Sequence, residues 1–245
     1  MRIPTTKGTC ARCGHAGTRA RLRQHLAQCR EPVNESPAPT RRHVAGGPAL
    51  LIEVVGRPKA HWLFLGVAAN ATLTDVDAAL RAIWLECCGH LSEFVVGRTR
   101  YTSEPPDRAF AAFSSGPRPQ SMRVPAGDVF RPGAPVEHLY DFGSTTILDL
   151  SAVGPLPVAL PSRTVVLLAN NESPRFVCSS CQRPAVSVCL ACDGPGGEGF
   201  FCETCGVAHA CGEEMLRPVA NSPRMGICGY TGPGAPSARR RPATS

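Results

Sequence analysis

The stretch CSSCQRPAVSVCLACDGPGGEGFFCETCGVAHAC, residues 178–211, holds seven cysteines and one histidine within 34 residues. A disulfide framework, a redox centre or a metal site would each explain this concentration of thiols. A segment of this length is too short to build an adequate hydrophobic core by itself. The chemistry of its cysteines therefore decides how it folds.

The rest of the chain favours metal over disulfides. The start, MRIPTTKGTCARCGH, has no apolar core of a signal peptide, and no apolar run approaches the ~20 residues that span a bilayer. We therefore expect a cytoplasmic protein without membrane contact, and disulfides are rare in a reducing cytosol. The chain has thirteen cysteines, an odd number that a pure disulfide framework cannot use up.

The spacing within the stretch predicts two zinc sites. Three consecutive C-x2-C pairs and a final H-x-C pair supply eight ligands, which fill two tetrahedral sites with none left over. Structural zinc contributes roughly 10–16 kcal/mol of apparent binding free energy, enough to replace a missing core. The predicted ligands are Cys178, Cys181, Cys189, Cys192, Cys202, Cys205, His209 and Cys211.

The pairing of these ligands has more than one solution. The spacing resembles cross-brace modules of the B-box type, in which pairs one and three hold one ion and pairs two and four hold the other. That resemblance would group Cys178, Cys181, Cys202 and Cys205 in one site and Cys189, Cys192, His209 and Cys211 in the other. Sequential pairing is the alternative. Cys228 is a further candidate for the last ligand position, in place of Cys211.

A third zinc site is predicted near the N-terminus, in the spacing C-x2-C-x11-H-x3-C. Its ligands would be Cys10, Cys13, His25 and Cys29. The last two are four residues apart, so one helical face would present both. Leu22 and Leu26 would pack beneath this C2HC finger. Its helix also carries Arg19, Arg21 and Arg23, so the alternatives are DNA binding, protein docking or a purely structural role, and one finger contacts only about three base pairs.

Three further residues of types that bind metal lie close together in the sequence, namely Cys87, Cys88 and His90. Adjacent cysteines on a helix point about 100° apart, which favours buried structural roles over metal binding. We therefore expect three Zn²⁺ ions. Sites filled by four protein ligands leave no open position for water, which argues against metal-assisted hydrolysis.

Hydrophobic patterning predicts an α+β fold between the cysteine-rich ends. Residues 49–56 and 61–68 are typical of two strands, 71–89 of a helix capped by Thr72 or Thr74, and 90–97 of another strand. Residues 102–134 contain six prolines and predict a long loop, before three further strands. We expect a central mixed or antiparallel sheet with one main helix, flanked by small zinc-binding modules. The predicted divisions are a finger-like module (1–30), a linker (31–48), the α+β domain (49–170), a two-zinc module (171–230) and a disordered tail (231–245).

The basic residues are unevenly distributed along the chain. Residues 1–48 carry nine Lys or Arg against two Asp or Glu, whereas residues 49–230 carry fourteen against seventeen. Ten thiolates on three Zn²⁺ would lower the formal net charge from +7 to about +3. The charge thus indicates a basic N-terminal module rather than a basic protein.

Three strings, WLECCGHLSEFVVG, LYDFGSTTILDLSAVG and CGEEMLRPVANSPRMGICGYTG, resemble the plasmid Ri ORF-three-like family of insertion-element passenger proteins, often labelled "TnpR". The resemblance covers residues 49–170, and the cysteine-rich extension of a bacterial subgroup takes it to about residue 232. The residues that carry it are Trp84, His90, Leu91, Phe94, Tyr101, Tyr140, Asp141, Phe142 and Gly143. Trp62 is followed by Leu63 and Phe64 where the family has two arginines, and the string after Gly143 also differs. The resemblance implies association with plasmids and mobile elements.

The label of that family suggests a resolvase, but the residues do not support one. A serine recombinase needs a nucleophilic serine among clustered arginines, and Ser144 and Ser151 lack such neighbours in the sequence. Tyr140–Gly143 contains the DFG tripeptide of kinases without a kinase catalytic loop, Gly-rich loop or strand lysine. We expect a non-enzymatic zinc-binding interaction or adaptor protein with a protein partner. The alternatives are a nucleic-acid-binding accessory protein acting through residues 1–48, and an uncharacterised activity at the Tyr140–Gly143 turn.

Overall fold

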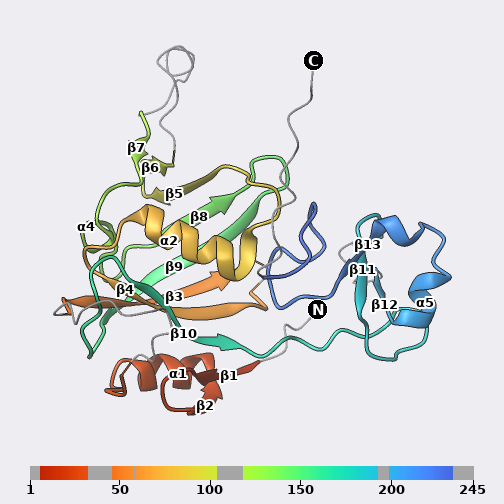
Figure 1. The fold of residues 1–245 in the computed structure, drawn as a ribbon, viewed down its shortest axis with the longest axis horizontal. Helices are drawn as coiled ribbons and strands as arrows, with labels where there is room; N and C mark the ends of the chain where they lie inside the picture. Colours follow the sequence, from red (N-terminus) through yellow and green to blue (C-terminus); the bar gives the residue numbers. More distant parts are fainter. Residues whose placement is uncertain (1–5, 33–45, 58, 104–117, 193–198, 234–245) are drawn as a thin grey trace, which may run out of the picture. The chain divides into compact units, whose positions relative to one another are not determined.

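The computed structural model describes residues 6–32, 46–57, 59–103, 118–192 and 199–233 of the 245. These residues divide into two units, which fall within residues 1–80 with 91–172 and within residues 81–90 with 173–245. The first unit holds a ten-stranded sheet in the order β2-β1-β10-β4-β3-β9-β8-β5-β6-β7 (Figure 1). Its elements are β1 (Lys7–Cys10), β2 (Ala16–Thr18), α1 (Arg19–Leu26), β3 (Ala49–Gly56), β4 (Trp62–Ala68), α2 (Leu73–Leu80), β5 (Ser92–Val96), β6 (Thr99–Thr102), β7 (Gln120–Ser121), α4 (Ala126–Val129), β8 (Val136–Tyr140), β9 (Thr146–Pro155) and β10 (Val165–Asn171).

The middle of the sheet is buried on both faces. Every residue of β4 is buried, and β3 has six buried positions out of eight. Strands covered on both faces read as continuous apolar runs rather than alternating ones. This explains the composition of WLFLGVA and ALLIEVVG.

One face of the sheet is covered by α2. His138 of β8 contacts Asp77 of α2 through Nε2 and Oδ1, 2.7 Å apart, and both side chains are buried. In the antiparallel pairing His138 lies opposite Leu148, and Leu150 of β9 lies opposite Val54 of β3. Residues two apart on a strand share a face. Val54 and Leu150 are therefore on the face that α2 covers.

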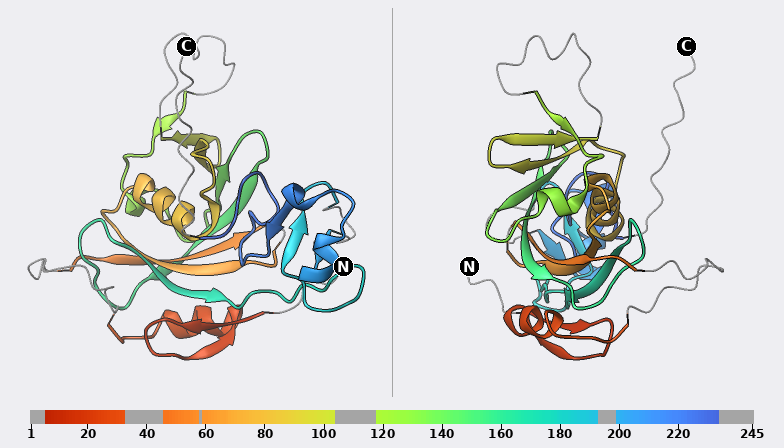
Figure 2. Two further views of the ribbon diagram at one scale, coloured as in Figure 1. Left: turned by 45° about the vertical axis from the view of Figure 1, so that its right-hand side comes forward. Right: turned by 90° about the vertical axis from the view of Figure 1, so that its left-hand side faces the viewer.

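The opposite face receives the N-terminal finger. Glu53 of β3 points away from α2 and is paired with Arg19 Nε at 3.3 Å and Arg23 Nη1 at 3.7 Å, both on α1. Strand β1 joins the sheet by antiparallel pairing with β10, as Gly8 with Asn171 and Cys10 with Ala169. Figure 2 shows this segment next to β10, in agreement with the strand order. The finger is thus built into the large sheet, which its sequence spacing alone does not predict.

The main helix begins as predicted and ends earlier. Thr72 and Asp75 form a capping box, in which Thr72 N donates to Asp75 Oδ2 (2.8 Å) and Asp75 N donates to Thr72 Oγ1 (3.3 Å). Of the two predicted capping residues, Thr72 is therefore the one that caps α2. The helix predicted to reach Gly89 gives way after Leu80 to a π-helical turn, η1 (Arg81–Leu85). Gly89 has φ +72°, which a helix cannot accommodate.

The prediction of one long loop over 102–134 is wrong in its described part. Residues 120–121 form β7, which pairs in parallel with β6, and residues 126–129 form the short helix α4. Met122, Ala126 and Phe130 are buried and anchor this stretch. Their apolar side chains follow no helix or strand period because the stretch changes direction between two short elements.

The second unit has a small sheet of three strands in the order β12-β11-β13. Its elements are η1, β11 (Ser187–Cys189), β12 (Phe200–Phe201), α5 (Glu203–Val207), the 3-10 turn η2 (Glu213–Met215) and β13 (Leu216–Pro218). The whole chain is therefore α+β, with a large mixed sheet, few helices and clusters of cysteine and histidine, as predicted. None of the helices in the described ranges is long and apolar enough to cross a bilayer.

Gly8 provides a test of the finger's place in the sheet. A Cβ at Gly8 would lie 2.2 Å from the carbonyl oxygen of Asn170 and 2.6 Å from the ring of Trp62, whereas a Cβ at Gly47 would meet nothing within 4 Å. We predict that Gly8→Ala destabilises the zinc-loaded chain by about 1–3 kcal/mol through overpacking. Gly47→Ala should leave the midpoint of urea unfolding nearly unchanged. Equal midpoints for the two variants would contradict the docking of β1 on β10.

Candidate metal centres

All thirteen cysteines are free thiols, and all of them lie in four groups of four potential metal ligands. Within each group the ligand atoms lie within 4.8 Å of one another. The groups are Cys10, Cys13, His25 and Cys29; Cys87, Cys88, His90 and Cys228; Cys178, Cys181, Cys202 and Cys205; and Cys189, Cys192, His209 and Cys211. Three of these groups are the predicted sites.

The distances within the groups fit a tetrahedral metal. Around Zn²⁺ with Zn–S bonds of about 2.3 Å, two sulfurs lie ~3.7 Å apart and a sulfur and a histidine nitrogen ~3.5 Å apart. The structure has Cys181 Sγ 3.6 Å from Cys202 Sγ, and Cys192 Sγ 3.6 Å from Cys211 Sγ and 3.5 Å from His209 Nε2. Disulfide bonds would need sulfurs about 2.05 Å apart. The clusters are therefore compatible with metal ions bound by thiolates and imidazoles.

The finger site joins a strand end, a tight turn and a helix. β1 ends at Cys10, and the turn after it is closed by Gly14 N donating to Cys10 O (2.9 Å), with Gly14 at φ +76°. His25 lies in the last turn of α1, and Cys29 lies just beyond its end with its N–H donating to His25 O (2.8 Å). His25 Nε2 is 3.2 Å from Cys13 Sγ. The predicted i, i+4 presentation of the last two ligands is thus retained although the helix itself ends at Leu26.

The surroundings of His25 favour its metal-binding form. Burial, followed by the neighbouring charges of His15 and Arg12, lowers the pKa of His25 and keeps its ring neutral. The ring of His15 stacks on that of His25, with centroids 4.4 Å apart. Leu22 and Leu26 are fully buried beneath the site, as predicted. The finger therefore has both a small apolar core and an orienting neighbour for its histidine.

The cysteine-rich module has the cross-brace pairing. The first and third C-x2-C pairs form one group, and the second pair joins His209 and Cys211 in the other. Cys228 does not take the place of Cys211, because it lies in a different group. Strand β11 runs from one site to the other, since it ends at Cys189 and pairs with β12 next to Cys202. The two sites and the small sheet are therefore interlocked.

Hydrogen bonds support thiolates in the four-cysteine group. Arg183 Nε donates to Cys181 Sγ at 3.3 Å, and this contact lowers the pKa of the Cys181 thiol. The pKa of Cys178 is lowered to about 6, first by a backbone hydrogen bond from Cys202. Four thiolates on Zn²⁺ carry a net charge of −2, and Arg183 partly balances it. In the same group the pKa of Cys205 is raised to about 12, first by its hydrogen bond to Cys181. These contacts therefore favour the thiolate form of Cys178 and Cys181, and a bound cation would be needed to deprotonate all four cysteines.

Most of the buried core of this module consists of its own metal ligands. Its buried cluster has four members, of which Cys178, Cys189 and Cys202 are ligand residues and Phe201 is the fourth. Phe201 also contacts the His209 ring, with centroids 4.2 Å apart. Val188 of β11 is also fully buried, and Met215 and Leu216 pack against the cluster. The apolar core is small for the length of the segment, so ordering it by apolar burial alone is costly.

The expectation that Cys87 and Cys88 have buried structural roles is wrong. Cys88 is exposed and Cys87 is only partly buried. The fourth member, Cys228, is 140 residues from Cys88 in sequence. Local spacing predicts ligand pairs on one turn, and it gives no signal for a group assembled from two distant segments.

A local hydrogen bond stabilises the turn that contains the DFG tripeptide, Asp141–Gly143. Asp141 is buried at φ +66°, and its Oδ1 accepts a hydrogen bond from Gly143 N at 2.9 Å. This local bond holds the turn after β8, a role that Asp and Asn commonly play. Phe142 is half exposed.

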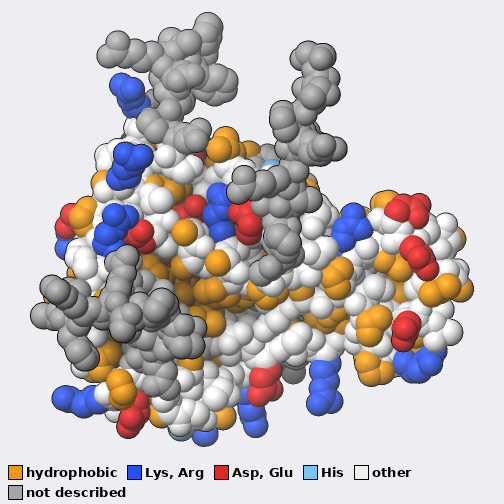
Figure 3. Space-filling view, viewed as in Figure 1, with side chains coloured by type: hydrophobic (Ala, Val, Ile, Leu, Met, Phe, Trp, Pro, Cys, Tyr) orange, Lys and Arg blue, Asp and Glu red, His pale blue; other side chains and the backbone are white. Residues whose placement is uncertain are grey.

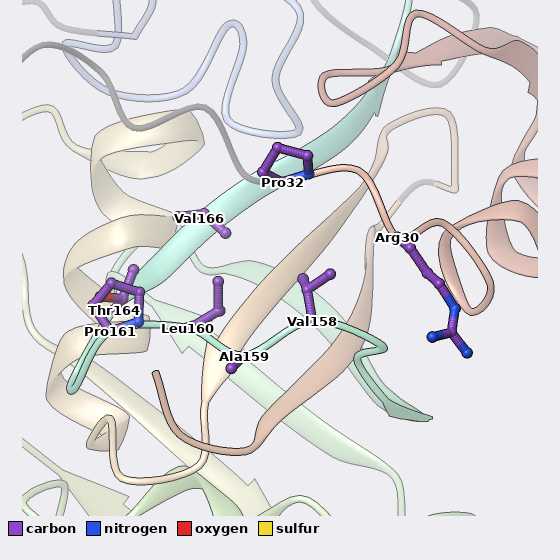
Figure 4. Close-up of a pocket in the computed structure, with 8 residues that line it drawn as sticks. All are labelled: Arg30, Pro32, Val158, Ala159, Leu160, Pro161, Thr164 and Val166. Carbon is purple, nitrogen blue, oxygen red and sulfur yellow. The ribbon is translucent and has the colours of Figure 1, made fainter. Parts of the chain in front are cut away.

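A shallow pocket of about 310 Å³ lies beside β10. It is lined by Arg30, Pro32, Val158, Ala159, Leu160, Pro161, Thr164 and Val166. In Figure 4 the side chain of Arg30 extends away from the apolar wall. Among the residues that the structure describes, the lining offers one hydroxyl and no carboxylate, thiol or imidazole, so these residues do not supply the converging acid, base or nucleophile of an active site.

Comparisons with known proteins give a distant structural similarity. No protein-family model matches the chain, and no curated protein matches it. One similar solved structure is a protein of unknown function from Methanosarcina mazei Go1, with 18% sequence identity and a TM-score of 0.43. The match covers 51% of this chain and 71% of that one. A similarity this distant, to a protein of unknown function, has no bearing on function.

Removal of metal should have different effects on the cysteine-rich module and on the large sheet. We predict that a zinc chelator unfolds the cysteine-rich module while the β3–β4–β9 part of the large sheet stays folded. The physical reason is that the sheet has a large apolar core, whereas the module has mainly its ligands. Hydrogen exchange measures this, since amides of β11 and β13 should lose protection before those of β3 and β4. Retained protection in β11 after complete removal of metal would contradict it.

Proposed function

We propose that the chain is a non-enzymatic, zinc-stabilised interaction protein. The observation that carries this proposal is that each predicted site already has four protein ligands within tetrahedral reach. A zinc ion held in this way has no open position for a substrate or a water molecule. Zinc would then stabilise the folded modules, and the function would depend on contacts made by their surfaces.

The cysteine-rich module offers exposed apolar side chains for such contacts. Val177, Val186 and Val207 are 50%, 54% and 69% exposed, and they belong to this module. Large apolar residues at these exposures are available for a protein partner. We propose that a protein docks on this module.

Nucleic-acid binding through the finger, the alternative, is less well supported. Two of the three arginines of α1 pair with Glu53 of β3, so these cations are already engaged by the chain itself. On the face in Figure 3, Lys and Arg side chains are scattered and Asp and Glu side chains lie among them. A helix that reads DNA needs a free basic face. Arg21 is exposed and is not part of the ion pairs with Glu53.

The cytoplasmic location and the link with mobile elements are also proposals. Free thiols arranged as metal ligands suit a reducing compartment, which supports the cytoplasm. The link with plasmids and mobile elements rests on the resemblance to the plasmid Ri ORF-three-like family alone.

The interaction role can be tested with a surface variant that spares every ligand. Val186→Ser with Val207→Ser should leave the zinc content and the unfolding midpoint of the module unchanged, because both side chains are more than half exposed. We predict that proteins from the host extract that are retained by the zinc-loaded wild type are released by this double variant. Quantitative mass spectrometry of matched affinity captures measures the ratio, which we expect to fall at least tenfold.

A captured set that does not change with the double variant would contradict the docking surface. The nucleic-acid alternative has its own signature, which is micromolar binding of random-sequence DNA at physiological salt with a steep salt dependence. Arg21→Ala should then lower the salt slope by about one. Deletion of residues 1–48 is a poor test, because it would remove β1 and β2 from the large sheet.

A further inference from the structure

We infer that Cys87, Cys88, His90 and Cys228 form a fourth zinc site, which fastens the C-terminal segment to the turn after η1. All four residues belong to the second unit. This inference does not depend on the proposed interaction role. It concerns a soft divalent cation held by three thiolates and one imidazole, for which Zn²⁺ is the typical ion.

The geometry of the group matches that of the predicted sites. Cys228 Sγ lies 3.7 Å from Cys88 Sγ and 3.5 Å from His90 Nε2. These separations are those of a sulfur pair and a sulfur–nitrogen pair around tetrahedral zinc, ~3.7 and ~3.5 Å. All four ligand atoms lie within 4.8 Å of one another.

The local backbone brings the ligands to one point. Gly89, between Cys88 and His90, has φ +72°, and this lets the chain reverse so that both side chains reach the same centre. Cys228 itself has φ +53°, a left-handed conformation that residues with a Cβ rarely adopt. A Cβ at Gly229 would lie 3.3 Å from Cys88 Sγ. The two segments thus approach each other closely at the thiols.

Buried polar groups beside the site hold the same two segments together. Ser222 Oγ donates to the carbonyl oxygen of Trp84 at 2.7 Å. Arg224 is fully buried, and its Nη2 lies 3.5 Å from Cys87 Sγ as a donor. Three thiolates and a neutral imidazole on Zn²⁺ carry a net charge of −1, and the guanidinium of Arg224 is placed to balance it. Arg183 stands in the same relation to Cys181 in the four-cysteine site.

The ligand count of the chain supports a fourth ion. Thirteen cysteines and three of the seven histidines make sixteen ligands, and the structure distributes them four to a group. Three sites would leave three thiols and an imidazole unused at ligand distances from one another. Four sites use every cysteine, which accounts for the odd number.

A Cys88–Cys228 disulfide is the competing explanation. It would need the sulfurs to move from 3.7 Å to about 2.05 Å apart, and it would use only two of the four ligand atoms that the structure brings together. The experiment below separates the two, because a disulfide lowers the zinc count and removes two hydrogens from the denatured mass.

The site differs from the other three in exposure. Each of the other groups has at least one buried cysteine, such as Cys10, Cys178 or Cys189, whereas the fourth has none. A chelator reaches exposed ligands first. We therefore expect the fourth ion to be the first released.

Native mass spectrometry of the full chain, purified under reducing conditions without chelator, tests the inference. The wild type should carry four Zn²⁺ and Cys228→Ser three. Ser222→Ala is the matched control, since it removes the hydrogen bond to Trp84 O from the same segment but no ligand, and it should carry four. A colorimetric chelator should remove one ion from the wild type in a fast phase that Cys228→Ser lacks.

Three results would overturn the inference, and the first does not depend on how any variant folds. The first is a wild-type count of three, with or without a disulfide in the denatured mass. The second is a count that stays at four in both Cys228→Ser and Cys88→Ser, which would identify the extra ion as adventitious. If Cys228→Ser loses more than one ion, the count of Cys88→Ser decides: three supports the site and four overturns it.

Discussion

Coordination of a metal ion by thiolates is the interaction on which, in our proposal, the cysteine-rich module of the second unit depends. Its strands are two or three residues long, and Phe201 is the one member of its buried cluster that is not a ligand residue. So few apolar contacts contribute little stability to a fold in water. Binding of Zn²⁺ by thiolates contributes far more. Because β11 connects the two interlocked sites, ions bound at both would stabilise the same small sheet. In our proposal the surface of this module, including its exposed valines, is folded only while metal is bound.

The first unit depends on a different constraint, a sheet that must be covered on both faces. Helix α2 covers one face, and the finger covers part of the other by adding β1 to the sheet and pairing Arg19 and Arg23 with the buried carboxylate of Glu53. A buried carboxylate without these partners would be costly. The finger thus resembles a DNA-reading module in its ligand spacing, while two arginines of its helix pair with Glu53 of the sheet. A zinc ion bound there would stabilise this contact between the finger and the sheet.

The sequence predicted what is encoded by local spacing. The C-x2-C pairs, the Thr72–Asp75 cap and the apolar runs of β3 and β4 each depend on neighbours within a few residues, and these predictions agree with the structure. The features that were not predicted from the sequence depend on contacts between segments that are far apart in the chain. The addition of β1 to β10 and the meeting of Cys228 with Cys88 each join segments more than 130 residues apart. No periodicity records such a contact, and the odd number of cysteines was the one available sign that a ligand had been left out.

X-ray absorption at the zinc edge tests most directly whether these are closed structural sites. Thirteen sulfurs and three nitrogens shared among four ions give an average first shell of about 3.25 sulfur and 0.75 nitrogen ligands, with Zn–S near 2.3 Å. We predict this shell and no oxygen in it. A first shell with fewer than about three sulfurs and a light atom at water distance would mean open coordination positions, and a catalytic role for zinc would then replace a structural one.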